Sequence, residues 1–278
     1  MEREASMRKT KRSFAYGFLV LSALITLFPI WWIFSTSFET NTRAYSFPGA
    51  LVPQFHWQNY QTAWSLAPWG RFLANSVGMG LVTTLLALLT SLLAAYALVF
   101  IPNRLNKLIF SLILATMMVP FYSIMIPDYL IVRDLGWLNS YMAQVVPFIA
   151  NGFAIFLFVQ FMRSFPKELR DAALMDGVGR WGYLWRILVP NLLPAINTVG
   201  VYLFLLSWNA FLWPLVVTNG PTVQPIQVGL ANFLSTANGT DWTVLSAAAA
   251  ITTLPMLILY VFAQRQIVES VSRTGIKG

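Results

Sequence analysis

The sequence predicts an all-α polytopic membrane protein with six transmembrane helices, and three observations support this fold class. The chain of 278 residues is 57% hydrophobic and only 10% charged, whereas soluble globular domains carry about 25% charged residues. Several apolar runs are long enough to cross a bilayer as a helix, which takes about 20 residues. No run shows the alternating segments of about 10 residues that are typical of outer-membrane strands.

Six apolar stretches are the predicted spans. They cover residues 14–38, 72–99, 108–131, 143–162, 192–217 and 243–264. The first span follows a short tail, 1–13, and is longer than a signal-peptide core without a small-x-small cleavage site, which predicts that it is retained. A loop, 39–71, separates it from the membrane core, 72–264, which contains the other five spans. Residues 265–278 form a C-terminal tail.

The distribution of basic residues predicts how the chain is oriented in the membrane. All but three of the 18 Lys and Arg residues lie on the side of the spans that carries both termini. The three exceptions are Arg43, Arg71 and Arg133. Because cytoplasmic loops carry an excess of positive charge, both termini are predicted to be cytoplasmic and the loop 39–71 external. Membrane topology thus accounts for the net charge of +8, and no nucleic-acid partner is expected.

The most distinctive segment is the predicted cytoplasmic loop 164–190, between the fourth and fifth spans. Ser164 and Pro166 are suited to start a helix, and Gly177 and Gly179 are suited to end it. A second amphipathic stretch follows the glycines, so the pattern predicts helix, glycine turn, helix. From the residues alone, this loop is either a docking surface for a partner or a pair of amphipathic helices lying on lipid headgroups.

The residues of this loop resemble the EAA motif of permease subunits of ATP-binding-cassette (ABC) importers. That motif reads E-A-A, three residues, G, nine residues, I-x-L-P. This chain has the same spacing, with Asp for Glu and Val for Leu: Asp171-Ala172-Ala173-x3-Gly177-x9-Ile187-x-Val189-Pro190. The resemblance extends over nearly the whole chain and is closest to the MalG-like carbohydrate branch. Shorter supporting stretches are Asn75-Ser76, Ala94-Ala95-Tyr96-Ala97, Ala115–Pro120, Ser207–Leu215 and the tail Gly275–Gly278.

The resemblance implies a type I ABC importer permease fold in the cell (inner) membrane. The expected partners are a second, non-identical permease subunit, two cytoplasmic ATPase subunits and an extracytoplasmic substrate-binding protein. The ATPase would use ATP and Mg²⁺, and no cofactor is expected on this chain. The residues that the resemblance implies for coupling to the ATPase are Asp171, Ala172, Ala173, Asp176, Gly177, Ile187 and Pro190.

Other features of the sequence agree with a transport subunit that is driven by a separate motor. No Walker A pattern occurs, so the chain is not expected to hydrolyse ATP. No charged residue lies near the middle of a predicted span, although ion-coupled carriers need such groups. With one His, no Cys and no paired carboxylates in the spans, neither catalytic residues nor a metal site are expected. A passive channel or secondary carrier is the alternative class.

Polar residues within the spans are candidates for a substrate pathway. Neutral donors and acceptors beside aromatic rings suit a sugar or oligosaccharide of the maltose or trehalose kind. Glycerol 3-phosphate or another small solute is the alternative substrate. Each polar residue could instead form a hydrogen bond between helices. The principal candidates are Asn209, Trp208, Asn151 and Asn75, and further candidates are Ser76, Gln144 and Asn197.

Overall fold

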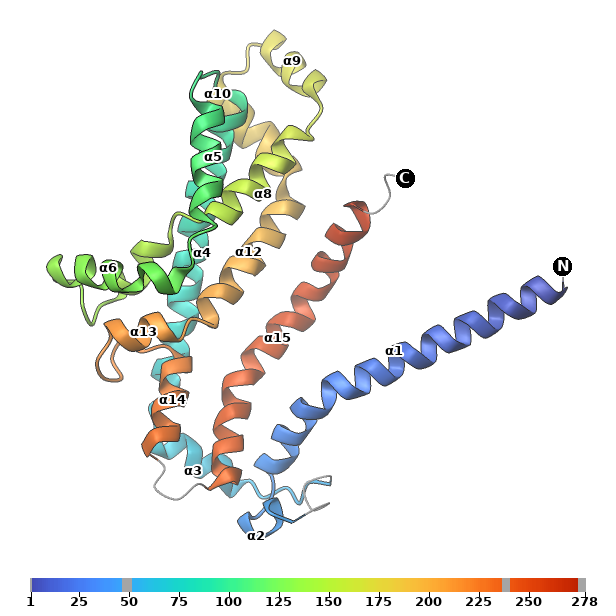
Figure 1. Ribbon diagram of the computed structural model, residues 1–278, viewed down its shortest axis with the longest axis vertical. Coiled ribbons are helices and arrows are strands. Elements are labelled where there is room, and N and C mark those ends of the chain that lie inside the picture. Colours follow the sequence, from blue (N-terminus) through green and yellow to red (C-terminus); the bar gives the residue numbers. More distant parts are fainter. Residues whose placement is uncertain (1, 47–51, 237–240, 275–278) are drawn as a thin grey trace. The chain divides into compact units, whose positions relative to one another are not determined.

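The computed structural model describes residues 2–46, 52–236 and 241–274. All the regular secondary structure within these ranges is helical (Figure 1). The end of the predicted C-terminal tail, 275–278, lies outside the described residues. The elements, in chain order, are α1 Glu2–Ser37, α2 Asn41–Ala44, α3 Gln58–Leu66, α4 Trp69–Phe100, α5 Asn106–Thr116, α6 Phe121–Asp134, α7 Tyr141–Val145, η2 Val146–Phe148, α8 Gly152–Arg163, α9 Lys167–Met175, α10 Arg180–Gly182, η3 Tyr183–Leu188, α11 Val189–Asn191, α12 Leu193–Trp208, α13 Leu212–Val217, α14 Ile226–Thr236 and α15 Trp242–Thr274.

Four stretches of the described chain are long and apolar enough to cross a membrane as helices. They are Phe14–Ser37, Trp69–Phe100, Tyr141–Arg163 and Trp242–Val261. They correspond to the first, second, fourth and sixth predicted spans. Two bent helix pairs would raise the number to six if each pair were one span: Asn106–Thr116 with Phe121–Asp134, and Arg180–Asn191 with Leu193–Trp208.

The predicted span 108–131 is broken into two helices in the structure. Helices α5 and α6 meet at an angle of 98°. Pro120, which precedes α6, has an extended conformation with ψ of 131°. Proline has no backbone N–H and disfavours helical dihedrals in the residue before it. The apolar stretch therefore continues through the break while the helix does not.

The predicted fifth span, 192–217, is also not one helix. Helix α12 ends at Trp208 and α13 begins at Leu212. The carbonyl oxygen of Leu205, in the last turn of α12, accepts both the backbone N–H and the Nδ2 of the intervening Asn209, at 3.0 and 2.9 Å. A second bend, of 77°, separates α12 from the preceding stretch Arg180–Asn191.

The chain divides into two compact units, and the larger consists of Trp69–Gly229 and Met256–Gly278. Its organising element is α4, which packs against both α8 and α12 (Figure 1). Small residues of α4 allow this contact, and a Cβ atom added to Gly80 would lie 2.8 Å from the Phe204 ring of α12. Buried residues of the three helices, such as Ala87, Phe158 and Leu203, form one hydrophobic core.

The smaller unit consists of Met1–Pro68 and Leu230–Pro255. In it, the end of α1 is fixed to α3. The hydroxyl groups of Ser37 and Tyr60 are hydrogen bonded at 2.7 Å, and Asn59 Nδ2 donates to the carbonyl oxygens of Ser37 and Glu39 at 2.9 and 2.7 Å. By contrast, the most apolar part of the span Phe14–Ser37 buries none of its residues within the described chain.

Candidate functional site

We call the segment 164–190 the EAA-like loop. Its first helix begins later than the sequence predicts. Ser164 does not start a helix but ends α8: it has helical dihedrals, and its Oγ donates to the carbonyl oxygen of Phe161 at 2.8 Å. Helix α9 begins at Lys167, directly after Pro166. The serine is a poor helix start here because its hydroxyl is already bonded to the preceding helix.

The glycine turn forms as the sequence predicts. Gly177 has φ of +71°, in the left-handed region that glycine adopts without steric cost. The amide of Val178 donates to the carbonyl oxygen of Ala173 at 2.9 Å, which is the six-to-one hydrogen bond of a Schellman helix end. Gly179 has ordinary extended dihedrals and precedes α10. Of the two glycines, only Gly177 is thus required by its backbone conformation.

The inner face of the EAA-like loop is part of the hydrophobic core of the larger unit. Tyr183, Leu184 and Leu188 are buried, and the short stretch that holds them is a π-helix. The hydroxyl of Tyr96, near the end of α4, donates to the carbonyl oxygen of Arg180 at 2.8 Å. The second half of the loop is therefore attached to α4 by apolar packing and by a specific hydrogen bond.

An aromatic cluster joins the first half of the EAA-like loop to the end of α4 as well. The Phe100 ring, at the end of α4, lies 5.4 Å from the rings of both Tyr96 and Tyr183, between centroids. The guanidinium carbon of Arg170, on α9, lies 5.6 Å from the centroid of Phe100, within the range of a cation–π interaction. Both halves of the loop thus contact the last turns of α4.

The outer face of the loop is exposed and carries large apolar side chains. Met175 is 89% exposed and Trp181 is 66% exposed. An exposed apolar patch bordered by charged groups is typical of a protein interaction surface. Of the seven residues implied for coupling, five are exposed and two face inward. The exposed residues are Asp171, Ala172, Asp176, Gly177 and Pro190; Ala173 is buried and Ile187 is half-buried in the core.

A cavity of about 500 Å³ lies in the same unit, between parts of α4, α6, α7, α12 and α13. We call it the neutral cavity, because none of the described residues that line it is charged. Asn151 and Asn209, two of the predicted pathway residues, line it. Asn151 also accepts the backbone N–H of Ala154 at 2.9 Å and so starts α8. Aromatic rings, including those of Tyr122 and Trp213, complete the wall.

The other two principal candidates do not line the neutral cavity. Trp208 is buried, with only 1% of its surface exposed. Asn75 connects α4 to a distant loop: its Nδ2 donates to the carbonyl oxygens of Thr222 and Gln224 at 3.1 and 2.9 Å, and its Oδ1 accepts the hydroxyl of Tyr141 at 2.8 Å. These bonds use both ends of the Asn75 amide.

Two other lining residues present polar atoms without a partner among the described residues. The Oγ1 of Thr83 and the Oε1 of Gln144 are both buried and make no hydrogen bond there. Gln144 was among the further candidates, and its Nε2 donates to the carbonyl oxygen of Val223 at 3.0 Å. Thr83 was missed, because a threonine in an apolar helix is an ordinary residue. Buried polar atoms are nearly always hydrogen bonded, so these two atoms are exceptions among the polar groups of the cavity wall.

No group of three or more His, Asp or Glu side chains in the described part of the chain could hold a metal ion.

Comparison with known proteins places the chain in a family. Residues 87–273 match the family described as "Binding-protein-dependent transport system inner membrane component". The sn-glycerol-3-phosphate transport system permease protein UgpE of Yersinia enterocolitica is 31% identical over 264 residues, covering 92% of this chain and 94% of UgpE. The lactose transport system permease protein LacG of Rhizobium radiobacter is 33% identical over 256 residues, covering 91% and 92%.

The fold also matches a solved structure. The similar chain comes from the crystal structure of a bacterial ABC transporter involved in the import of the acidic polysaccharide alginate. The TM-score is 0.82 at 25% sequence identity, and the match covers 92% of this chain and 97% of the other. Members of the family are transport permease subunits, not enzymes. This chain belongs to the binding-protein-dependent transport system inner membrane component family, as the permease subunit of an ABC importer.

Proposed function

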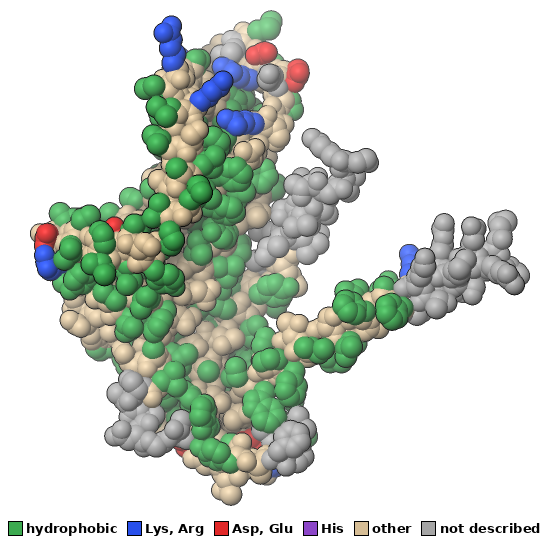
Figure 2. Space-filling view, in the orientation of Figure 1, with side chains coloured by type: hydrophobic (Ala, Val, Ile, Leu, Met, Phe, Trp, Pro, Cys, Tyr) green, Lys and Arg blue, Asp and Glu red, His purple; other side chains and the backbone are tan. Residues whose placement is uncertain are grey.

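We propose that this permease crosses the cell membrane six times, with both termini in the cytoplasm, and that it imports a neutral oligosaccharide of the maltose or trehalose kind. The six spans are the four long helices and the two bent pairs. The basic residues support this orientation, since Lys and Arg side chains gather around the end of the larger unit that carries α9 and α10 (Figure 2).

The EAA-like loop is proposed to dock on a separate cytoplasmic ATPase, one of a pair that binds and uses ATP and Mg²⁺. Its exposed outer face offers the carboxylates of Asp171 and Asp176 beside the apolar Met175 and Trp181. Its inner face is attached to α4. When the ATPase pair closes, the loop would move as a lever and shift α4 between two rigid-body arrangements. This combination of an anchored and an exposed face is the observation that supports coupling.

The remaining partners are proposed from the family and the resemblance. A second, non-identical permease subunit would complete the pathway, and the unburied apolar surface of Phe14–Ser37 is available to that subunit or to lipid. An extracytoplasmic binding protein would deliver the substrate, in keeping with the family description.

The neutral cavity is the observation that favours a sugar over glycerol 3-phosphate. It combines aromatic rings with the amides of Gln144, Asn151 and Asn209 and the hydroxyl of Thr83. Arg and Lys side chains bind phosphate by charge-assisted hydrogen bonds, and none of the described lining residues is charged. Glycerol 3-phosphate stays the second candidate because the relative UgpE carries it in its name.

The docking proposal is tested by charge reversal on the loop. With the ATPase co-expressed, Asp171→Arg is expected to abolish co-purification of the ATPase while membrane insertion is unchanged. The matched control is Asp134→Arg, which reverses another exposed carboxylate, on α6. Equal ATPase recovery from both variants would refute docking through this face.

The substrate proposal is tested by uptake. Proteoliposomes containing the assembled importer, its binding protein and ATP are expected to accumulate a labelled neutral disaccharide or oligosaccharide. Accumulation of glycerol 3-phosphate without any sugar would reverse the choice between the two substrates. Uptake that is independent of ATP would contradict the coupling mechanism.

A further inference from the structure

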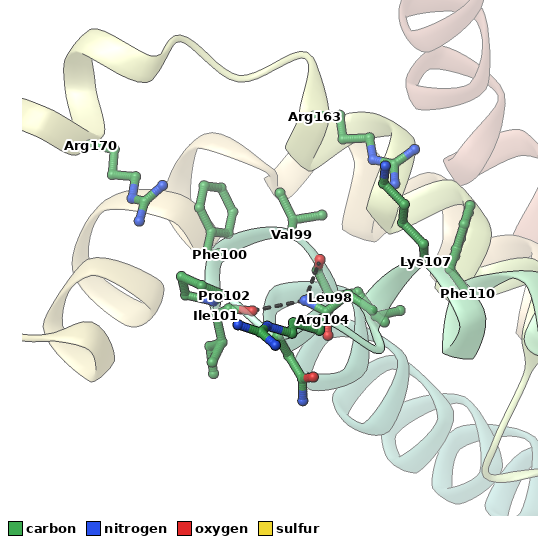
Figure 3. A pocket seen from close by; sticks show the side chains of 12 residues that line it. Leu98, Val99, Phe100, Ile101, Pro102, Arg104, Lys107, Phe110, Arg163 and Arg170 are labelled. Carbon is green, nitrogen blue, oxygen red and sulfur yellow. Dashed lines mark hydrogen bonds between the residues drawn. The ribbon is translucent and has the colours of Figure 1, made fainter.

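A second cavity, of about 660 Å³, lies where the chain leaves α4 and enters α5 (Figure 3). It is lined mainly by residues 98–107 and shares no lining residue with the neutral cavity. Neither docking by the outer face of the EAA-like loop nor sugar transport requires it. We call it the basic cavity, because its described charged residues are all cationic.

Four basic side chains from separate segments converge on this cavity. Arg104 belongs to the turn between α4 and α5, Lys107 to the first turn of α5, Arg163 to the end of α8 and Arg170 to α9. None of the four pairs with a carboxylate of the described chain within 4.0 Å. So many unpaired cations around one cavity indicate that its ligand is an anion.

Two of these cations are held against aromatic rings. The guanidinium carbon of Arg163 lies 5.0 Å from the centroid of Phe110, and that of Arg170 lies 5.6 Å from the centroid of Phe100. Such cation–π contacts orient an arginine without neutralising it. The two guanidinium groups thus keep their positive charge for a ligand.

The floor of the cavity is a turn with a defined backbone. Asn106 Nδ2 donates to the carbonyl oxygens of Leu98 and Ile101 at 3.1 and 2.8 Å, which caps the end of α4. Asn103 Oδ1 accepts the backbone N–H of Leu105 at 2.9 Å. These bonds hold the backbone of the turn, and its apolar side chains, including Leu98, Val99 and Pro102, line the cavity.

We propose that the basic cavity binds the phosphate headgroup of an anionic phospholipid, with acyl carbons against the apolar wall. The cavity lies at the ends of two membrane-crossing stretches, Trp69–Phe100 and Tyr141–Arg163. Lipid phosphates are found at this level, and basic pockets between helices there bind lipid headgroups. A free phosphate ion would leave the apolar wall without a counterpart, which is why a lipid is favoured.

A lipid in this position would touch both the α4–α5 turn and Arg170 of the EAA-like loop. The proposal does not depend on the identity of the transported substrate. It also differs from docking of the ATPase, which uses the exposed outer face. Failure of one proposal is therefore distinguishable from failure of the other.

The test is lipid binding to the purified full-length chain in a neutral detergent, measured by native mass spectrometry. The probes are phosphatidylglycerol and phosphatidylcholine with identical acyl chains. Wild-type protein is expected to retain phosphatidylglycerol preferentially. The double variant Arg104→Gln/Lys107→Gln removes two exposed cations and is expected to weaken that binding about 30-fold, since each basic residue contributes about 1 kcal/mol.

Two further variants separate the site from overall charge. Arg71→Gln/Arg133→Gln removes two positive charges outside the cavity and is expected to leave binding of phosphatidylglycerol unchanged. Arg104→Lys/Arg163→Lys keeps the charge and is expected to keep the preference. Phosphatidylglycerol, but not phosphatidylcholine, is also expected to raise the unfolding temperature of the wild type, and this test needs no substitution.

Four outcomes would overturn the proposal. The first is equal retention of the two lipids by the wild type, and the second is an equal loss of binding in the charge control. The third is complete displacement of the lipid by millimolar inorganic phosphate, which would assign the site to a free anion. The fourth is unchanged binding of phosphatidylglycerol by Arg104→Gln/Lys107→Gln; loss of ATPase co-purification from the same variant would then assign the cations to the partner protein.

Discussion

The hydroxyl of Tyr96 donates a hydrogen bond of 2.8 Å to the backbone carbonyl oxygen of Arg180, 84 residues further along the chain. This bond joins α4 to the second half of the EAA-like loop. Because α4 also packs against α8 and α12, we expect a displacement of the loop to reach the centre of the larger unit.

Replacement of Tyr96 by Phe removes the hydroxyl and keeps the ring that contacts Phe100. The loss of one hydrogen bond is expected to destabilise attachment of the loop by about 1 kcal/mol. The assembled importer should then hydrolyse ATP with less sugar transported per ATP, as measured in proteoliposomes. The control is Tyr202→Phe, since the hydroxyl of Tyr202 makes no hydrogen bond within the described residues. An unchanged ratio in Tyr96→Phe would show that the bond does not transmit movement.

Gly177→Ala places a Cβ atom on a residue with φ of +71°. A left-handed conformation costs a non-glycine residue about 1–2 kcal/mol, so the turn of the loop should distort. ATPase co-purification is expected to fall several-fold. Gly179→Ala is the matched control, because its φ is −66° and an added Cβ atom meets nothing within 4 Å. Similar losses from both substitutions would contradict the role given to the turn.

Gly80→Ala tests the contact between α4 and α12. The added Cβ atom would lie 2.8 Å from the Phe204 ring, and that ring is itself stacked on Trp208 with 6.0 Å between centroids. Overpacking of this kind costs about 1–3 kcal/mol, so the unfolding temperature in detergent should fall. Gly78→Ala, which meets nothing within 4 Å, should leave that temperature unchanged or slightly raised. A wild-type unfolding temperature for Gly80→Ala would mean that Phe204 moves freely.

Thr83→Val tests the neutral cavity. The Oγ1 atoms of Thr83 and of its neighbour Thr84 are both buried without a hydrogen bond among the described residues, but only Thr83 lines the cavity. Removing an unsatisfied buried hydroxyl should not destabilise either variant. Sugar uptake is expected to fall about tenfold in Thr83→Val, equivalent to ~1.4 kcal/mol, and to stay normal in Thr84→Val. Normal uptake by both would exclude the Thr83 hydroxyl from substrate binding.

The sequence predicts much of the fold because the membrane imposes simple rules on composition and helix length. It does not predict where the spans break. Pro120 separates α5 from α6 at 98°, whereas the stretch Tyr141–Arg163 is not sharply bent, although Pro147 lies in its 3-10 segment and Asn151 is extended before α8. The two prolines look alike in the sequence. Whether a helix continues past a proline depends on tertiary contacts that compensate for the missing hydrogen bond.

The candidate sites are also only partly predictable from the sequence. The turn at Gly177 is predictable because local backbone geometry demands glycine. The neutral cavity is not, since its walls come from segments far apart in the chain. Asn75 and Asn209 are equivalent amides in the sequence, yet Asn75 is bonded to a loop about 150 residues away while Asn209 lines the cavity.

The neighbouring alanines of the EAA-like loop face opposite ways, with Ala172 exposed and Ala173 only 4% exposed. A bulky side chain in place of Ala172 would obstruct a neighbouring polypeptide. A bulky side chain in place of Ala173 would disturb folding of the subunit itself. Inactive mutants from these adjacent codons would therefore have different causes, and only an assay for correct insertion could tell them apart.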